Sequence, residues 1–128
     1  MSYKILVVDD EVAVRETLCD LLQNEECFAS SCSSGEEALV FLAKQECDIV
    51  LLDIKLAEAS GLEVLKNIRQ IYKELPVVMI TGFGYDEDLI AKSRQLGCSG
   101  YVGKNMSAAK IITIIKQFVK NAQDKTCG

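Results

Sequence analysis

The chain has 128 residues, a length typical of one domain, and 19 Asp and Glu against 14 Lys and Arg give it a net charge of −5. It contains no histidine, which excludes Ser/His/Asp and Cys/His triads, histidine-containing zinc sites and phosphohistidine carriers. Sequence-independent binding to nucleic acid requires a basic surface, so the acidic charge argues against a direct nucleic-acid partner.

The apolar runs are too short to cross a membrane. The longest, at 49–52 and 76–80, fall well below the ~20 apolar residues that a spanning helix needs. Near the N-terminus, four apolar residues are followed directly by Asp9 and Asp10, which does not fit a signal peptide. The six cysteines include no Cys-x-x-Cys pair, so a zinc ribbon or thioredoxin-like motif is absent. We therefore expect a cytoplasmic protein with no membrane role and with reduced cysteines.

Short apolar runs alternate with amphipathic stretches in the first part of the chain. Residues 4–8 predict a buried strand, and apolar residues at helical spacing over 14–22 predict a helix after it. A weaker strand is expected at 27–32. Ser34 and Glu37 have the spacing of a capping box, which predicts that the next helix begins there.

The alternation continues to the end of the chain. We expect strands at 48–52, 76–81 and 100–103, and helices at 62–72, 86–96 and 108–119. Gly97 is a typical residue to end the helix at 86–96. The last helix has the clearest apolar face, and the residues after it read as frayed. The sequence therefore predicts a domain at 1–121 followed by a frayed tail at 122–128.

Strands that alternate with helices predict a parallel sheet covered on both faces, which explains why the strands are continuously apolar. The crossovers between such strands should be right-handed. We therefore expect an α/β fold of the flavodoxin-like kind. Its five parallel strands would form a doubly wound sheet of order 2-1-3-4-5, flanked by five helices.

Polar side chains follow four of the predicted strands at their carboxyl ends. Asp9 and Asp10 end the first strand, Asp53 the third and Thr81 the fourth, and Lys104 follows the fifth. Ligands of open α/β sheets bind beyond the carboxyl ends of the strands. We therefore expect three carboxylates, a hydroxyl and an ammonium group to meet at one edge of the sheet.

Three carboxylates in one place repel one another unless a cation lies among them. Oxygen ligands without histidine or thiolate favour a hard ion such as Mg²⁺, with Mn²⁺ as an alternative. Beside the metal and Lys104, one carboxylate can stay ionised and act as a nucleophile. Thr81 can donate to a phosphoryl oxygen. The combination favours phosphoryl transfer, although each of these residues alone would more often be a helix cap or a turn residue.

Five stretches resemble the receiver domain of two-component response regulators. They are Asp-Asp-Glu at 9–11, Asp53 after its strand, Ser-Gly-Leu-Glu at 60–63, Thr-Gly at 81–82 and Gly-Tyr-Val-Gly-Lys at 100–104. The resemblance covers about residues 3–121. It implies that Asp53 accepts a phosphoryl group from a phosphohistidine on a histidine kinase or histidine phosphotransfer protein. It also implies a set of Mg²⁺ ligands, namely Asp9, Asp10, Asp53 and the backbone carbonyl of Lys55.

The same resemblance implies a switch rather than an enzyme that acts on a substrate. Lys104 would pair with the phosphoryl group, while Thr81 and Tyr101 would rearrange around it. The change would remodel the face formed by the fourth helix, fifth strand and fifth helix, to which a downstream protein would bind. We expect a monomer or a weak phosphorylation-dependent dimer, with intrinsic Mg²⁺-dependent autophosphorylation and autodephosphorylation.

The sequence departs from the family near the expected site. Asn105 stands where a cis-joined Pro is usual, and a non-Pro cis bond costs about 2.5–4 kcal/mol, which favours a trans bond here. Ala57 also replaces a usual Pro, which predicts a more mobile loop. Phe83 has no group to orient a water. We expect its ring to shield the phosphoryl group and slow self-dephosphorylation, and the alternative is an aromatic residue that contacts a partner.

Other functions stay open. The chain could be the receiver part of a larger transcription regulator or hybrid kinase rather than a stand-alone receiver. A metal-dependent aspartyl phosphatase also uses an Asp nucleophile, but such enzymes have Asp-x-Asp where Asp9 and Asp10 are adjacent here. A flavodoxin-like nucleotide binder is disfavoured because three acids repel a phosphate and no glycine-rich loop follows the first strand.

Overall fold

The computed structural model describes residues 3–23, 27–56, 60–82, 87–104 and 106–127. Strands and helices alternate along the whole chain, as predicted. The elements are β1 (Tyr3–Val8), α1 (Val12–Gln23), β2 (Cys27–Cys32), α2 (Gly35–Lys44), β3 (Ile49–Asp53), α3 (Gly61–Ile71), β4 (Val77–Thr81), α4 (Glu87–Gln95), β5 (Gly100–Gly103) and α5 (Ala108–Cys127).

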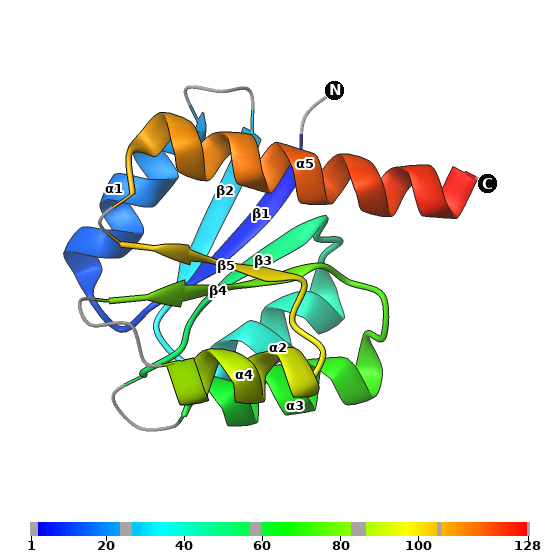
Figure 1. Cartoon of the computed structure of the whole chain (residues 1–128). Coiled ribbons are helices and arrows are strands. Elements are labelled where there is room, and N and C mark those ends of the chain that lie inside the picture. The colour runs from blue at the N-terminus through cyan, green and yellow to red at the C-terminus, as the bar shows by residue number, and fades with distance from the viewer. Residues whose placement is uncertain (1–2, 24–26, 57–59, 83–86, 105, 128) are drawn as a thin grey trace.

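The described strands form one five-stranded parallel sheet of order β2-β1-β3-β4-β5. This confirms the predicted doubly wound topology. Helices α1 and α5 cover one face of the sheet, and α2, α3 and α4 cover the other (Figure 1). Because β1, β3 and β4 are parallel neighbours, their carboxyl ends lie next to one another at one edge of the sheet.

The core lies on both faces of the sheet because side chains of a strand alternate between its faces. Ile5 and Val7 of β1 pack in the cluster with α1 and α5, whereas Leu6 and Val8 pack in the cluster with α2 and α3. All residues of β3 and β4 are buried. Burying each such aliphatic side chain contributes roughly 1.5–3 kcal/mol, so the strands that carry the site are also the most firmly packed.

The helix ends follow local rules that were visible in the sequence. The Ser34 hydroxyl accepts a hydrogen bond from the amide of Glu37 at 3.2 Å, and the Glu37 carboxylate accepts one from the amide of Ser33 at 3.3 Å. The capping box is therefore present, except that the Glu37 carboxylate bonds to the amide of Ser33 and not to that of Ser34. Gly97, with a φ of 97°, follows α4 as predicted.

Helix α5 is longer than expected. It continues to Cys127, so the backbone is helical through most of the segment predicted to be a frayed tail at 122–128. The domain boundary after residue 121 stays a prediction. In the part of the chain that the structure describes, no helix combines the length and apolar character that a membrane crossing needs.

Candidate functional site

The structure brings the polar strand-end residues to one edge of the sheet. Asp53 and Thr81 are the last residues of β3 and β4, Asp9 and Asp10 follow β1, and Lys104 follows β5. Because β1, β3 and β4 are neighbours, their carboxyl ends meet. The convergence expected from the sequence is therefore present in the structure.

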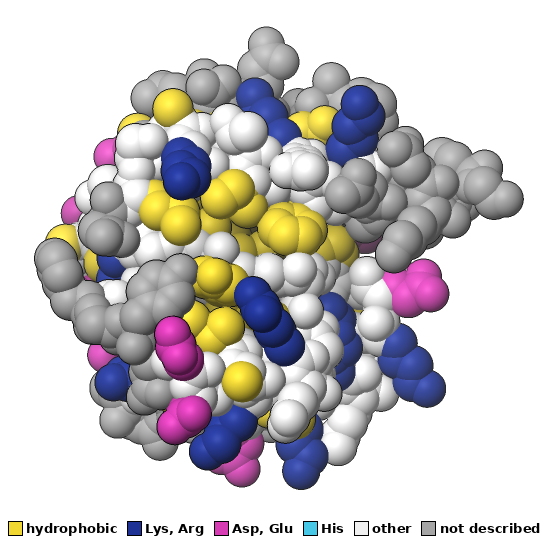
Figure 2. Space-filling view, viewed as in Figure 1, with side chains coloured by type: hydrophobic (Ala, Val, Ile, Leu, Met, Phe, Trp, Pro, Cys, Tyr) yellow, Lys and Arg dark blue, Asp and Glu magenta, His cyan; other side chains and the backbone are white. Residues whose placement is uncertain are grey.

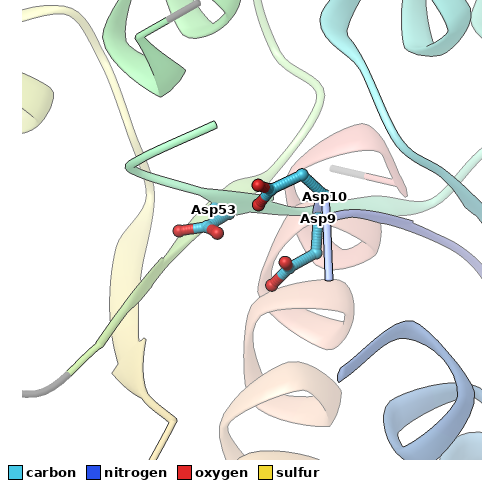
Figure 3. A group of neighbouring side chains, drawn as sticks. All are labelled: Asp9, Asp10 and Asp53. Carbon is cyan, nitrogen blue, oxygen red and sulfur yellow. The ribbon is translucent and has the colours of Figure 1, made fainter. Parts of the chain in front are cut away.

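Three carboxylates form the centre of the site. Asp9, Asp10 and Asp53 each offer an oxygen, and these oxygens all lie within 4.8 Å of one another. Figure 3 shows the three side chains beside one another at this edge of the sheet. Asp9 and Asp53 are buried at 0% and 3% exposure, whereas Asp10 is exposed. The cluster is thus closed on the side of the sheet and open to solvent at Asp10.

The Asp53 carboxylate is held from two sides. The Lys55 amide donates to Oδ1 at 3.1 Å, and the Lys104 ammonium donates to Oδ2 at 3.3 Å. Burial raises the pKa of Asp53 to about 6, and the Asp9 carboxylate adds to the rise, while the Lys55 amide and Lys104 oppose it. Asp53 is therefore ionised for the most part at neutral pH, but its charge is costly.

Lys104 lies among three carboxylates. Its Nζ is 2.9 Å from Glu11 Oε1, 3.3 Å from Asp9 Oδ2 and 3.3 Å from Asp53 Oδ2. Burial alone would lower the pKa of Lys104, but the hydrogen bond that it donates to Glu11 and the charges of Asp53 and Asp9 outweigh it and raise that pKa. Lys104 therefore stays a cation at the edge of the site.

The donors present fit a hard divalent cation. Asp9 Oδ2 is buried and has no hydrogen-bond partner among the described residues, since Lys104 approaches it as a charge without hydrogen-bond geometry. An unsatisfied buried acceptor costs about 1–3 kcal/mol, more when it is charged. A cation bound among the three carboxylates would satisfy this oxygen and reduce their mutual repulsion.

Two contacts from the start of α1 fix the position of Asp9. The Glu11 amide donates to Asp9 Oδ1 at 2.9 Å, and Arg15 Nη1 donates to the backbone carbonyl of Asp9 at 2.6 Å. Sequence reasoning missed the contact of Arg15 with Asp9 and the pairing of Glu11 with Lys104. The available clue was position, because Glu11 follows the two aspartates and Arg15 lies one helical turn beyond it.

Thr81 faces the edge strand rather than Asp53. Its hydroxyl donates to the carbonyl of Val102 on β5 at 3.4 Å, and its side chain is buried. Tyr101 on the same strand is half-buried, and the Arg94 guanidinium lies 5.4 Å from the centre of its ring. Thr81 is therefore bonded to β5, whereas Tyr101, a residue of β5, contacts α4 in this structure.

Three predictions fall on residues that the structure does not describe. Ala57, Phe83 and Asn105 lie outside the described residues. The mobile loop at Ala57, the shielding by the Phe83 ring and the trans bond before Asn105 therefore stay predictions. Lys55 is described and exposed, and its amide contacts Asp53. The role of its carbonyl as a metal ligand stays a prediction.

A parallel sheet of this order, with an acidic cluster and a lysine at its carboxyl edge, is typical of proteins that carry a phosphoryl group on an aspartate. Residues 5–116 match the response regulator receiver domain family, and the chain belongs to that family. Sporulation initiation phosphotransferase F of Bacillus subtilis is 30% identical over 93% of this chain and 95% of its own length. Regulatory protein VanRc of Enterococcus gallinarum is 32% identical over 96% of this chain but only 52% of its own length.

Solved structures agree with this assignment. The receiver domain of NtrX from Brucella abortus is 30% identical, superimposes with a TM-score of 0.86, and is matched over 91% of this chain and 98% of that one. A structure of NtrX in complex with ADP gives a TM-score of 0.93 over 98% of this chain, which spans only 29% of that protein. The chain thus corresponds to all of some relatives and to one part of others.

Proposed function

We propose that this receiver domain is a phosphorylation switch in which Asp53 is the phosphoacceptor. The observation that supports the proposal most directly is the buried Asp53 carboxylate at the end of β3, with Lys104, Asp9 and Asp10 around it. One of its carboxylate oxygens would attack phosphorus, while the Lys55 amide at Oδ1 and the Lys104 ammonium at Oδ2 orient the carboxylate. The new bond joins Asp53 to phosphorus, and the bond from phosphorus to the donor's leaving atom breaks.

A histidine kinase or a histidine phosphotransfer protein would supply the phosphoryl group. These 128 residues contain no histidine, so the imidazole that leaves with the electron pair of the broken bond must come from outside them. Membership of the receiver family supports the same donor class. A small acyl phosphate can replace that donor if the chemistry resides in this chain. We therefore propose an intrinsic capacity for autophosphorylation and autodephosphorylation.

Mg²⁺, or Mn²⁺ in its place, would bind at Asp9, Asp10 and Asp53, with the Lys55 carbonyl as a further ligand. A divalent ion there neutralises the charge that gathers when an anionic phosphoryl group meets an anionic carboxylate. The unsatisfied Asp9 Oδ2 supports this assignment. Lys104, which already contacts Asp53, would balance the remaining charge.

The response would pass through Thr81 and Tyr101 to the α4–β5–α5 face. A phosphoryl group on Asp53 would offer the Thr81 hydroxyl a charged acceptor, and hydrogen bonds to charged groups are about twice as strong as neutral ones. Thr81 would then leave the Val102 carbonyl, and Tyr101 would turn inward on the neighbouring strand. Figure 2 shows hydrophobic side chains gathered on this face between α4 and α5. They would bind a downstream protein or a second copy in a weak phosphorylation-dependent dimer.

A second candidate is that the chain is the receiver part of a larger regulator. The matches to about half of VanRc and to 29% of one NtrX chain favour it. The chemistry proposed for Asp53 is the same in both cases, and only the target of the switch differs. The cytoplasmic location stays a prediction from the sequence.

The central proposal can be tested by incubating the protein with Mg²⁺ and acetyl phosphate, followed by intact-mass measurement. We expect one added phosphoryl group, stable in acid and labile in base, as for an acyl phosphate. Asp53→Ala should lose it, whereas Asp20→Asn on α1, which also removes an acid, should keep it. Absence of the adduct in the unmodified protein, or its persistence in Asp53→Ala, would overturn the proposal.

A further inference from the structure

The shortest contact of Lys104 is with a residue that has no role in the mechanism above. Glu11 Oε1 lies 2.9 Å from Lys104 Nζ, closer than either Asp9 or Asp53 at 3.3 Å. The Glu11 side chain is 59% exposed, whereas those of Asp9 and Asp53 are 0% and 5% exposed. The contact therefore lies at the mouth of the site, and it joins the loop after β1 to the loop after β5.

The backbone of Glu11 is fixed before its side chain reaches Lys104. Its amide donates to Asp9 Oδ1 at 2.9 Å, and its carbonyl accepts a hydrogen bond from the Arg15 amide at 3.1 Å in the first turn of α1. Because both backbone groups are held, only the side-chain torsions must be ordered to form the ion pair. The Glu11 carboxylate is thus presented to Lys104 by the same segment that positions Asp9.

Glu11 also differs from the other two partners of Lys104 in its relation to a metal. The carboxylates that could share a cation are those of Asp9, Asp10 and Asp53, and Glu11 is not among them. A cation bound there would reduce the pull of Asp9 and Asp53 on Lys104. Of the three described carboxylates that contact the Lys104 ammonium, that of Glu11 would then be the one not neutralised by the cation. It would hold Lys104 at the mouth of the site.

We propose that Glu11 is a positioning residue that holds Lys104 at the mouth of the site and competes with the phosphoryl group for it. The proposal rests on the function proposed for Asp53. The phosphoryl group must take over one of the three ammonium donors, and Glu11 occupies the one nearest the entrance. An exposed ion pair is weak, so the effect of its removal is expected to be several-fold rather than many orders of magnitude.

The test compares Glu11→Gln with the unmodified protein and with Glu16→Gln, which removes an exposed acid from α1. Calorimetry measures the Kd for beryllofluoride, an anion that mimics a phosphoryl group on a carboxylate, at saturating Mg²⁺. We expect Glu11→Gln to lower this Kd two- to ten-fold and to speed phosphorylation by acetyl phosphate by a similar factor. Glu16→Gln should change neither by more than about 1.5-fold.

Three further measurements separate a direct contact from a general effect of charge or of metal binding. Glu11→Asp keeps the charge but is one methylene shorter, so it should resemble Glu11→Gln if contact with Lys104 matters. The difference between Glu11→Gln and the unmodified protein should shrink at 1 M salt, where the Debye length is only about 3 Å. The Kd for Mg²⁺ alone should change less than three-fold, because Glu11 is not expected to bind the metal.

The inference is overturned if Glu11→Gln leaves the Kd for beryllofluoride unchanged or raises it, or if Glu16→Gln has an equal effect. It is also overturned if Glu11→Asp behaves as the unmodified protein, or if Glu11→Gln weakens Mg²⁺ binding ten-fold or more. The unmodified protein reports separately on the proposed function. If it bound no beryllofluoride and gained no phosphoryl group, that function and this inference would both fail.

Discussion

Asp53 combines burial with a negative charge, which should make the stability of the protein depend on pH. Its folded pKa of about 6 lies above its ordinary value of 3.8. Since the folded state then binds the proton more tightly, its contribution to stability is full below pH ~4 and is lost as pH rises through about 6. At pH 7.5 without divalent metal, the ionised group is a net cost to folding.

Asp53→Asn should therefore stabilise the metal-free protein at pH 7.5 by roughly 1–2 kcal/mol, since it removes a buried charge that Lys104 compensates only in part. At pH 4 the same substitution should change the free energy of unfolding by much less, because most of the native carboxyl is already protonated. Urea denaturation at the two pH values measures both. A gain of equal size at pH 4 and pH 7.5 would contradict the argument.

The placement of the site residues was predictable from the sequence where backbone position decides it. Asp53 and Lys104 come together because parallel strands end at the same edge, which the strand pattern alone implies. The partner of a side chain in a loop is a different matter. The pairing of Glu11 with Lys104 links residues 93 positions apart, and the hydroxyl direction of Thr81 depends on a β5 carbonyl, so neither follows from periodicity.

At the scale of elements, β3 and α3 approach each other so closely that only glycine fits between them. A Cβ added to Gly61 would overlap the backbone carbonyl of Asp53 and approach the backbone of Ile54. Gly61→Ala should therefore push α3 from the end of β3 and destabilise the protein by about 1–3 kcal/mol, as for overpacked sites. Thermal denaturation measures the loss.

Gly82 provides the matched control for Gly61, because a Cβ there meets no atom of the described residues within 4 Å. Gly82→Ala should leave stability within about 0.5 kcal/mol of the unmodified protein, as is usual for surface substitutions. Equal effects of the two alanines would mean that the approach of α3 to β3 is not the cause.

Helix α4 and strand β5 are joined by the contact of Arg94 with Tyr101. A cation over an exposed aromatic ring contributes about 0.5–1 kcal/mol. A double-mutant cycle of Arg94→Gln with Tyr101→Leu should give a coupling energy in that range. Lys92→Gln, which removes another exposed cation from α4, should show no coupling to Tyr101→Leu. A coupling energy near zero in the first cycle would exclude a role for Arg94 in holding Tyr101 over α4.

The order and type of the elements were predictable because each carries its own pattern. The strands β3 and β4 are continuously apolar since helices cover both of their faces, and α5 has an apolar stripe that packs on the same core cluster as α1. The end of α5 was not predictable, because residues beyond its apolar stripe give no periodic signal. The helix nonetheless extends to Cys127.

At the scale of the whole molecule, the fold concentrates negative charge at one edge of a sheet that is otherwise apolar. The sheet supplies rigid strands that fix Asp53 and Thr81, while the more exposed loops after β1 and β5 supply Glu11 and Lys104. A hydrophobic surface lies between α4 and α5 (Figure 2). A change in charge at that edge can reach the surface through the β4–β5 pair, where Thr81 bonds to Val102.

A ligand that binds only the folded state adds to the stability of the entire domain. If Mg²⁺ binds among Asp9, Asp10 and Asp53, a Mg²⁺ concentration of ten times its Kd should raise the free energy of unfolding by about 1.4 kcal/mol, and EDTA should reverse the gain. Asp10→Asn should lose most of this gain without destabilising the metal-free protein, because Asp10 is exposed and removal of its charge relieves repulsion from the other two carboxylates. Asp20→Asn, an exposed acid on α1, should keep the full gain. Thermal denaturation with and without Mg²⁺ decides the matter: an equal Mg²⁺ gain in Asp10→Asn and in the unmodified protein would place the cation elsewhere on this acidic surface.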